Sequence, residues 1–173
     1  MYKKLVVLFF IWVTCFTCRA QLVTRIGSGS DTTYLISAKH FTGVIFPASY
    51  VNNIEEDKRF TPVKGEINEA EIALNKIWDK VNLYGKSKYA RNILVNVTPY
   101  FANYKRQYFG YKNDHNQKVI FINLLNFADK KEANKYLSNW KSKFIVGFDG
   151  FYEHNTAGFS FNLATKEIVA GAY

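Results

Sequence analysis

The densest group of side chains able to hold a ligand lies in residues 105–111, which read Lys-Arg-Gln-Tyr-Phe-Gly-Tyr. If this block is a strand, Arg106 and Tyr108 point to the same face, because side chains alternate along a strand. A guanidinium group and a phenol on the open face of a sheet would suit an anionic or glycan ligand. We therefore expect Arg106, Tyr108 and Tyr111 to contact a ligand or partner. In the plainer alternative, Tyr108 or Phe109 packs in the core and Arg106 is solvated.

Asp149, Glu153 and His154 form a second polar group, in a predicted loop. A histidine beside carboxylates can act in acid–base catalysis or bind a metal ion. However, the spacing matches no metal-ligand motif, and loop residues of this kind are usually surface residues. We therefore predict no catalytic residue, no metal site and no cofactor, and retain these three residues as a polar loop of secondary interest.

Residues 27–30, Gly-Ser-Gly-Ser, belong to no established nucleotide or nucleophile motif. They lack the Gly-Lys-Ser/Thr ending and the following helix of a phosphate-binding loop. They are also too short for a Gly-x-Ser-x-Gly element, and no strand–turn–helix pattern surrounds them. This segment is therefore predicted to be a turn.

The first twenty residues have the three parts of a secretory signal peptide in the required order. Lys3 and Lys4 supply the positive start, and residues 5–17 form a nearly unbroken apolar stretch. Small side chains three residues and one residue before the cut favour cleavage after Ala20. The apolar stretch of about 13 residues is shorter than the roughly 20 that a membrane-spanning helix needs. We therefore expect a secreted or periplasmic protein with no transmembrane span in its mature form.

Lipid attachment at Cys18 is the alternative fate of this N-terminus. A bacterial lipoprotein signal has an aliphatic residue three positions before the cysteine and a small residue directly before it. Cys15, Phe16 and Thr17 precede Cys18, so the match is poor. A soluble exported product is the favoured expectation.

The composition of the remaining 153 residues suits one domain. Both cysteines, Cys15 and Cys18, leave with the signal peptide, so disulfides, thiolate metal sites and cysteine nucleophiles are excluded from the mature chain. The net charge falls from +9 to +6 when three basic residues are removed, which leaves 20 basic and 14 acidic residues. The basic residues are spread along the chain instead of forming a run, which argues against a nucleic-acid partner.

One long amphipathic helix is predicted after Thr61. Thr61 suits an N-cap and Pro62 suits the first helical position, where its missing N–H costs nothing. Gly85 suits the end of the helix. Apolar residues recur between them at spacings of three and four, as expected for one buried helix face: Ile67, Ala70, Leu74, Ile77 and Val81.

The second half of the chain has the pattern of an antiparallel meander. Two β-rich segments, 105–112 and 118–125, flank the turn sequence Asn-Asp-His-Asn and predict a hairpin. Alternating apolar residues predict two further strands, at 144–148 and 158–163. The last strand returns through a polar turn into residues 167–170.

These elements predict an α+β fold in which one long amphipathic helix packs on a four-stranded antiparallel β-meander. The helix would cover one sheet face and leave the other more exposed. The expected organisation is a signal peptide at 1–20, an irregular segment with room for short strands at 21–59, and an α+β domain at 60–173. Residues 86–104 fit either a helix-like connection or a strand.

Short segments between residues 60 and 173 also carry a resemblance: Thr61-Pro62, Glu66-Ile67, Ala70-Glu71, 104–111, 120–123, Trp140, Asp149-Gly150 and 161–166. They are similar to small exported proteins of Bacteroidota-type bacteria, a group with no established site to carry over. The order of elements resembles the cystatin-like and nuclear-transport-factor-like α+β folds. Those folds serve inhibitors, binding modules and some enzymes, so the resemblance implies shape and export more than activity.

These features favour a non-catalytic binding or accessory module of the envelope or medium, whose partner is another envelope protein or a glycan. Two alternatives stay open: a small enzyme whose sheet curls around a pocket lined by tyrosine and phenylalanine, and an inhibitor or toxin-neutralising protein. A deep pocket with Asp149, His154 or Arg106 pointing inward would favour the enzyme. A flat, solvent-facing aromatic patch would favour binding.

Overall fold

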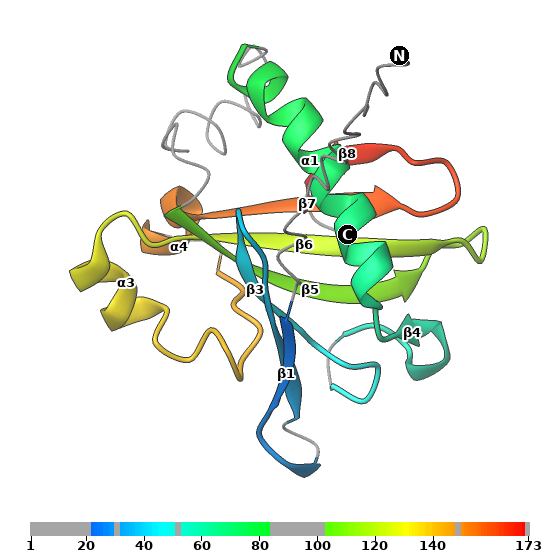
Figure 1. Ribbon diagram of the computed structural model, residues 1–173, viewed down its shortest axis with the longest axis horizontal. Coiled ribbons are helices and arrows are strands. Elements are labelled where there is room, and N and C mark those ends of the chain that lie inside the picture. Colours follow the sequence, from blue (N-terminus) through cyan, green and yellow to red (C-terminus); the bar gives the residue numbers. More distant parts are fainter. Residues whose placement is uncertain (1–21, 30–31, 51–52, 84–102, 148–149, 172–173) are drawn as a thin grey trace, which may run out of the picture.

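A mixed β-sheet lies at the centre of the protein (Figure 1). The computed structural model describes residues 22–29, 32–50, 53–83, 103–147 and 150–171. The expected signal peptide, Asp149 and almost all of the ambiguous segment 86–104 lie outside the described residues.

The described part of the chain contains eight strands and three α-helices. The strands are β1 (Leu22–Ile26), β2 (Thr33–Ser37), β3 (Thr42–Ile45), β4 (Arg59–Phe60), β5 (Tyr104–Lys112), β6 (Lys118–Asn126), β7 (Thr156–Asn162) and β8 (Ile168–Ala170). The helices are α1 (Lys64–Leu83), α3 (Lys130–Tyr136) and α4 (Gly150–Asn155), and a short 3-10 helix, η2, lies at Glu56–Lys58.

The strands follow the order β1-β2-β3-β5-β6-β7-β8, and β4 pairs with β5. All neighbouring strands are antiparallel except β3 and β5, which are parallel. The expected four-stranded antiparallel meander under one helix is therefore wrong, because the sheet is mixed and twice as large. Three of the additional strands come from residues 22–45, whose short apolar segments become strands by pairing with β5 and with one another.

The N-terminal half of this sheet depends on a close approach that glycine permits. Gly43 of β3 faces Arg106 of β5 in the parallel register. A Cβ atom at Gly43 would lie 2.4 Å from the ring of Tyr108, which is closer than real Cβ contacts. The absence of a side chain therefore lets the Tyr108 ring lie against the β3 backbone, a common use of glycine inside a strand.

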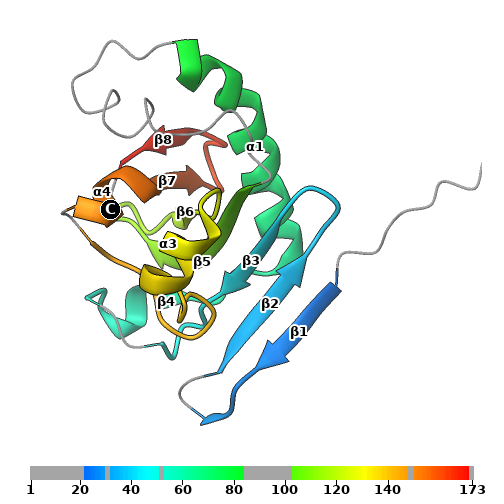
Figure 2. The same ribbon diagram turned by 90° about the vertical axis from the view of Figure 1, so that its left-hand side faces the viewer.

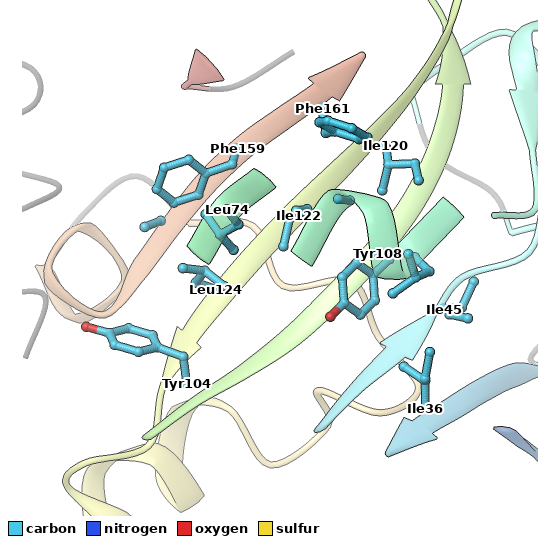
Figure 3. Packing of buried hydrophobic residues seen from close by; sticks show 13 residues of the cluster. Ile36, Ile45, Leu74, Tyr104, Tyr108, Ile120, Ile122, Leu124, Phe159 and Phe161 are labelled. Atoms are coloured by element: carbon cyan, nitrogen blue, oxygen red, sulfur yellow. The ribbon is translucent and has the colours of Figure 1, made fainter. Parts of the chain in front are cut away.

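Both faces of the sheet are covered, so the expectation of one more exposed face is wrong. One core, under α1, contains Ile67, Ala70 and Leu74 of the helix packed on Ile120, Ile122, Leu124, Phe159 and Phe161 of the sheet (Figure 3). The other core contains Phe109, Phe121 and Leu125 of the sheet under α3 and residues 137–147. The last eight residues of β6 are all buried, as expected for a strand with two covered faces.

The helix α1 is confirmed, but it begins at Lys64 and Thr61 does not cap it. The Glu66 carboxylate accepts a 2.9 Å hydrogen bond from the Val63 amide, and the Val63 carbonyl accepts from Ile67 N. This is half of a capping box with Val63 at the N-cap position. The Thr61 hydroxyl instead accepts a hydrogen bond from Ala48 N and holds the preceding loop.

The predicted hairpin is also confirmed, as β5 and β6. The Asn113 side-chain oxygen accepts hydrogen bonds from His115 N and Gln117 N, and Asn116 takes a positive φ of 57°. Asparagine supplies both features readily, because it bonds to its own backbone and tolerates the left-handed region. The turn chemistry therefore sets the register of the two longest strands.

The strand predicted at 144–148 is wrong within the described residues 144–147, which form no strand. Side chains of the sheet form hydrogen bonds with the backbone N–H and C=O groups that a strand would use for pairing. Ile145 N donates to Gln107 Oε1 at 2.8 Å, and Ile145 O accepts from Asn123 Nδ2 at 2.8 Å. The alternation that suggested a strand, Phe144, Val146 and Phe148, does not mark a buried face, because Val146 is 58% exposed. The consecutive residues Phe144 and Ile145 both pack into the second core instead.

Candidate functional site

Arg106 and Tyr108 do share a face of β5, but α1 covers that face. Both side chains are fully buried. The exposed pair expected from the sequence is therefore absent. The plainer alternative is right that Tyr108 and Phe109 pack in the core and wrong that Arg106 is solvated. Figure 3 shows Tyr108 inside the core among Leu74, Ile122 and Ile45.

The buried pair meets a carboxylate from α1. The Tyr108 hydroxyl donates a 2.8 Å hydrogen bond to Glu71 Oε1, and Arg106 Nε lies 3.5 Å from the same oxygen. Arg106 also donates to the Tyr104 carbonyl and lies 5.6 Å from the centre of the Phe41 ring. The three side chains form a charged network inside an otherwise apolar core.

Burial dominates the electrostatics of this network. Desolvation raises the pKa of Glu71, and the Arg106 charge and the Tyr108 hydrogen bond oppose that rise only in part. Burial, together with the Glu71 charge, raises the pKa of the Tyr108 phenol well above its ordinary value. Glu71 Oε2 accepts no hydrogen bond from the described residues. The network joins helix to sheet, and its groups are closed off from solvent.

Sequence reasoning missed Glu71, although a signal was present. Glu71 lies four residues after Ile67 and three before Leu74, on the apolar stripe of the helix. A carboxylate at such a position needs a buried partner, because an unpaired buried charge is costly. Arg106 on the strand below is that partner.

A second buried network lies on the opposite face, where two amides hold residues 140–145. Gln107 Nε2 donates to the carbonyls of Trp140 (2.6 Å) and Lys143 (2.8 Å), and its Oε1 accepts from Asn123. With the bonds to Ile145, the two side chains replace strand pairing for this segment. This network holds residues 140–145 against the sheet.

Tyr111 is the predicted binding residue that lines a cleft. The cleft has a volume of about 410 Å³ and opens to solvent. The half-buried Tyr111 and Ile54 contribute apolar surface to its lining. Tyr111 leans on Phe109 of the second core, with 6.0 Å between ring centres. The lining is Asn53, Ile54, Glu55, Lys58, Tyr111, Lys112, Asn113 and Asp114, called here the Tyr111 cleft.

The rim of the Tyr111 cleft carries both signs of charge. Lys58 and Glu55 form an exposed 2.9 Å ion pair, and Lys112 and Asp114 lie on the β5 side. The hydrogen bond and charge of Glu55, helped by Asp114, raise the pKa of Lys58. The cleft therefore offers hydrogen-bond donors and acceptors together with an aromatic side chain.

The polar loop expected at 149–154 is a short helix in its described part. His154 is exposed in the last turn of α4, while Asp149 lies outside the described residues and so does the side chain of Glu153. The loop prediction is therefore wrong for residues 150–154, and the grouping of the three side chains stays a prediction. A smaller cleft of about 350 Å³ lies beside α4, lined by residues that include Tyr136, Lys143 and Tyr152.

The aromatic side chains beside that smaller cleft pack on one another. Tyr136 stacks on Phe151 with 4.4 Å between ring centres, and Lys135 Nζ lies 4.6 Å from the Tyr136 ring centre. Tyr152 lies so close to Gly147 that a Cβ atom there would be 2.2 Å from the ring. These aromatic rings therefore pack mainly on one another.

No group of three His, Cys, Asp or Glu side chains that could hold a metal ion occurs within the residues that the structure describes. Among the same residues, no helix is both long and apolar enough to cross a membrane. Comparison with protein-family models, curated proteins and solved structures finds no match.

Proposed function

We propose that this protein is an exported, non-catalytic binding module that holds a glycan in the Tyr111 cleft. The observation that carries the proposal is a partly exposed tyrosine in the lining of an open cleft, together with side chains of both charges and an amide. A cleft lined by aromatic and apolar side chains with a few polar groups is a common form of ligand site.

The chemistry of the rim selects the ligand class. Glu55 and Asp114 accept hydrogen bonds, Lys58 and Lys112 donate them, and the Asn53 amide does both. A ligand with one sign of charge would meet like charge on half of this rim. Sugar hydroxyls both donate and accept, and the apolar face of a sugar ring packs on an aromatic side chain. A neutral, polyhydroxylated ligand therefore suits the cleft best.

Binding to a panel of immobilised oligosaccharides tests this function. The purified protein should bind neutral oligosaccharides more strongly than uronate or amino-sugar chains. Tyr111→Ala should reduce the affinity at least about tenfold, the effect of losing roughly 1.4 kcal/mol of contact. Tyr111→Phe should retain most of it, because the ring stays.

Two further variants test whether binding depends on the Tyr111 cleft or on another part of the surface. Asn53→Ala removes a rim group without touching the core and should weaken binding. Asn139→Ala, an exposed amide beside the smaller cleft, should leave it unchanged. Equal binding by wild type and Tyr111→Ala, with both folded by circular dichroism, would refute the proposal, as would the absence of binding to any neutral oligosaccharide.

A further inference from the structure

The strand β1 is the exposed edge of the sheet. Within the described residues it pairs with β2 alone, in a register that sets Thr24 opposite Leu35. Figure 2 shows β1 at the outer side of the β2–β3 pair, away from α1 and α3. Among the described residues, no strand pairs with the backbone N–H and C=O groups on the outer edge of β1.

The side chains of β1 are also uncovered, on both of its faces. Leu22 is 65% exposed and Val23 is 41% exposed, and Thr24 and Arg25 are exposed as well. Ordering a strand costs conformational free energy that burial normally offsets. In β1, apolar side chains are ordered with little burial to compensate, so a partner on this edge would add the missing contacts.

The opposite edge of the sheet, β8, also exposes an apolar side chain, Val169, but this strand is shorter. β8 has only three residues, Ile168–Ala170, and very short edge strands are one way in which proteins prevent edge-to-edge pairing. β1 has five residues and a single charged side chain, Arg25. Arg25 lies 3.3 Å from the Thr32 hydroxyl of the same hairpin, to which it donates a hydrogen bond.

The sequence of β1 fits a second copy of itself. In an antiparallel pair centred on Thr24, one face sets Leu22 against Ile26 of the second copy and Thr24 against Thr24. This face reads apolar–polar–apolar in both directions. Opposed apolar residues and opposed threonines are both favourable cross-strand pairs.

The other face of the same pair avoids a clash of charges. Val23 of one copy lies opposite Arg25 of the other, so no two like charges are directly opposed. The aliphatic part of an arginine side chain can cover a valine while its charged end stays in water. Both faces of β1 are therefore compatible with a two-fold axis at Thr24.

We propose that two copies of this chain associate through β1, antiparallel and centred on Thr24, to form one continuous sheet. A symmetric pair of this kind is the commonest oligomer type. A five-residue strand pair is smaller than a standard protein interface, so the association is weak, with a dissociation constant of about 0.1 mM. The proposal is independent of the Tyr111 cleft.

Charged substitutions at Thr24, on the two-fold axis, test the proposal. Sedimentation velocity over a concentration series should show reversible dimers of the wild type. Thr24→Lys and Thr24→Glu each place like charges opposite one another across the axis, and each should weaken self-association at least about tenfold. An equimolar mixture of the two variants should restore dimers, because an ammonium group then faces a carboxylate across the axis.

The control is Ala170→Lys, which adds the same charge to the exposed β8 edge and should leave the dimer unchanged. A wild type that stays monomeric at roughly 0.5 mM, several times the expected dissociation constant, would overturn the proposal. So would a Thr24→Lys variant that dimerises as well as the wild type, or an Ala170→Lys variant that does not. Dimers lost in both Thr24 variants but not restored by mixing would exclude the register centred on Thr24.

Discussion

The Tyr108 hydroxyl donates a 2.8 Å hydrogen bond to Glu71 Oε1 and so links the middle of β5 to the middle of α1 inside the core. The two residues are 37 positions apart in the chain, and both are nearly or fully inaccessible to solvent. Hydrogen bonds to a buried charged group contribute more than neutral ones, because the charge cannot be solvated otherwise. This contact is therefore a principal attachment of the helix to the sheet.

Tyr108→Phe should destabilise the protein by about 1–3 kcal/mol, the usual cost of leaving a buried polar group without its partner. The ring remains, so the packing against Gly43 is unaffected. Urea denaturation monitored by circular dichroism measures the change. Tyr34→Phe is the matched control, since Tyr34 packs at the margin of the same core and should change stability by much less. An equal effect of the two substitutions would contradict the role of the Glu71 contact.

Glu71→Gln should change how stability depends on pH. The folded-state pKa of Glu71 is raised by burial above its ordinary value of 4.5, so folding favours the protonated form. The stability that folding gains from this raised pKa of Glu71 is fully present below pH 4.5, and it is lost as the pH rises through the folded-state pKa. The wild type should therefore lose stability relative to Glu71→Gln as the pH increases over this range.

Denaturant titrations of the wild type and Glu71→Gln at several pH values measure that difference. Glu71→Gln should be less stable than the wild type at low pH, because the amide disturbs the contacts with Arg106 and Tyr108. The difference in free energy of unfolding between the two proteins should become smaller at higher pH. A difference that increases with pH would mean that the ion pair of Glu71 with Arg106 outweighs the desolvation of Glu71.

Gln107→Leu should loosen residues 140–145 from the sheet. The substitution removes the partner of two carbonyl groups and of Ile145 N, and we expect a loss of about 2–3 kcal/mol. Hydrogen exchange should be faster at the Ile145 amide than in the wild type, while the β5–β6 hairpin stays protected. Asn134→Leu, an exposed change on α3, should alter neither property. Unchanged exchange at Ile145 would show that packing alone holds the segment.

Gly110→Ala and Gly65→Ala should have opposite effects on stability. A Cβ atom at Gly110 would lie 2.6 Å from the Phe60 carbonyl oxygen, so β4 must move away from β5. We expect that change to cost about 1–3 kcal/mol. Gly65 lies in α1 with nothing within 4 Å of a Cβ atom, and alanine there should stabilise by about 0.4–1 kcal/mol. Thermal unfolding of the two variants distinguishes them, and a stable Gly110→Ala protein would argue against the close pairing of β4 with β5.

The local elements of this protein follow from short stretches of sequence. The spacing of Ile67, Ala70 and Leu74 predicts α1, because a helix buries every third or fourth residue. The turn residues beginning at Asn113 predict the β5–β6 hairpin for a similar reason, since the turn's hydrogen bonds lie within five residues. The shared face of Arg106 and Tyr108 also follows from alternation along the strand. Each of these predictions depends only on near neighbours in the chain.

The size of the sheet and the place of the candidate site required the tertiary structure. β3 pairs in parallel with β5, about sixty residues later in the chain, and no local pattern specifies that partner. Alternation shows that Arg106 and Tyr108 lie together, but only the packing of α1 decides that their face is buried. Tyr111 lines the cleft because residues 53–58 return beside the end of β5. The sequence by itself determined α1, the β5–β6 hairpin and which of their side chains share a face, because those patterns are local. Contacts between distant segments decided that residues 22–45 join the sheet, that residues 144–147 do not, and which faces meet solvent.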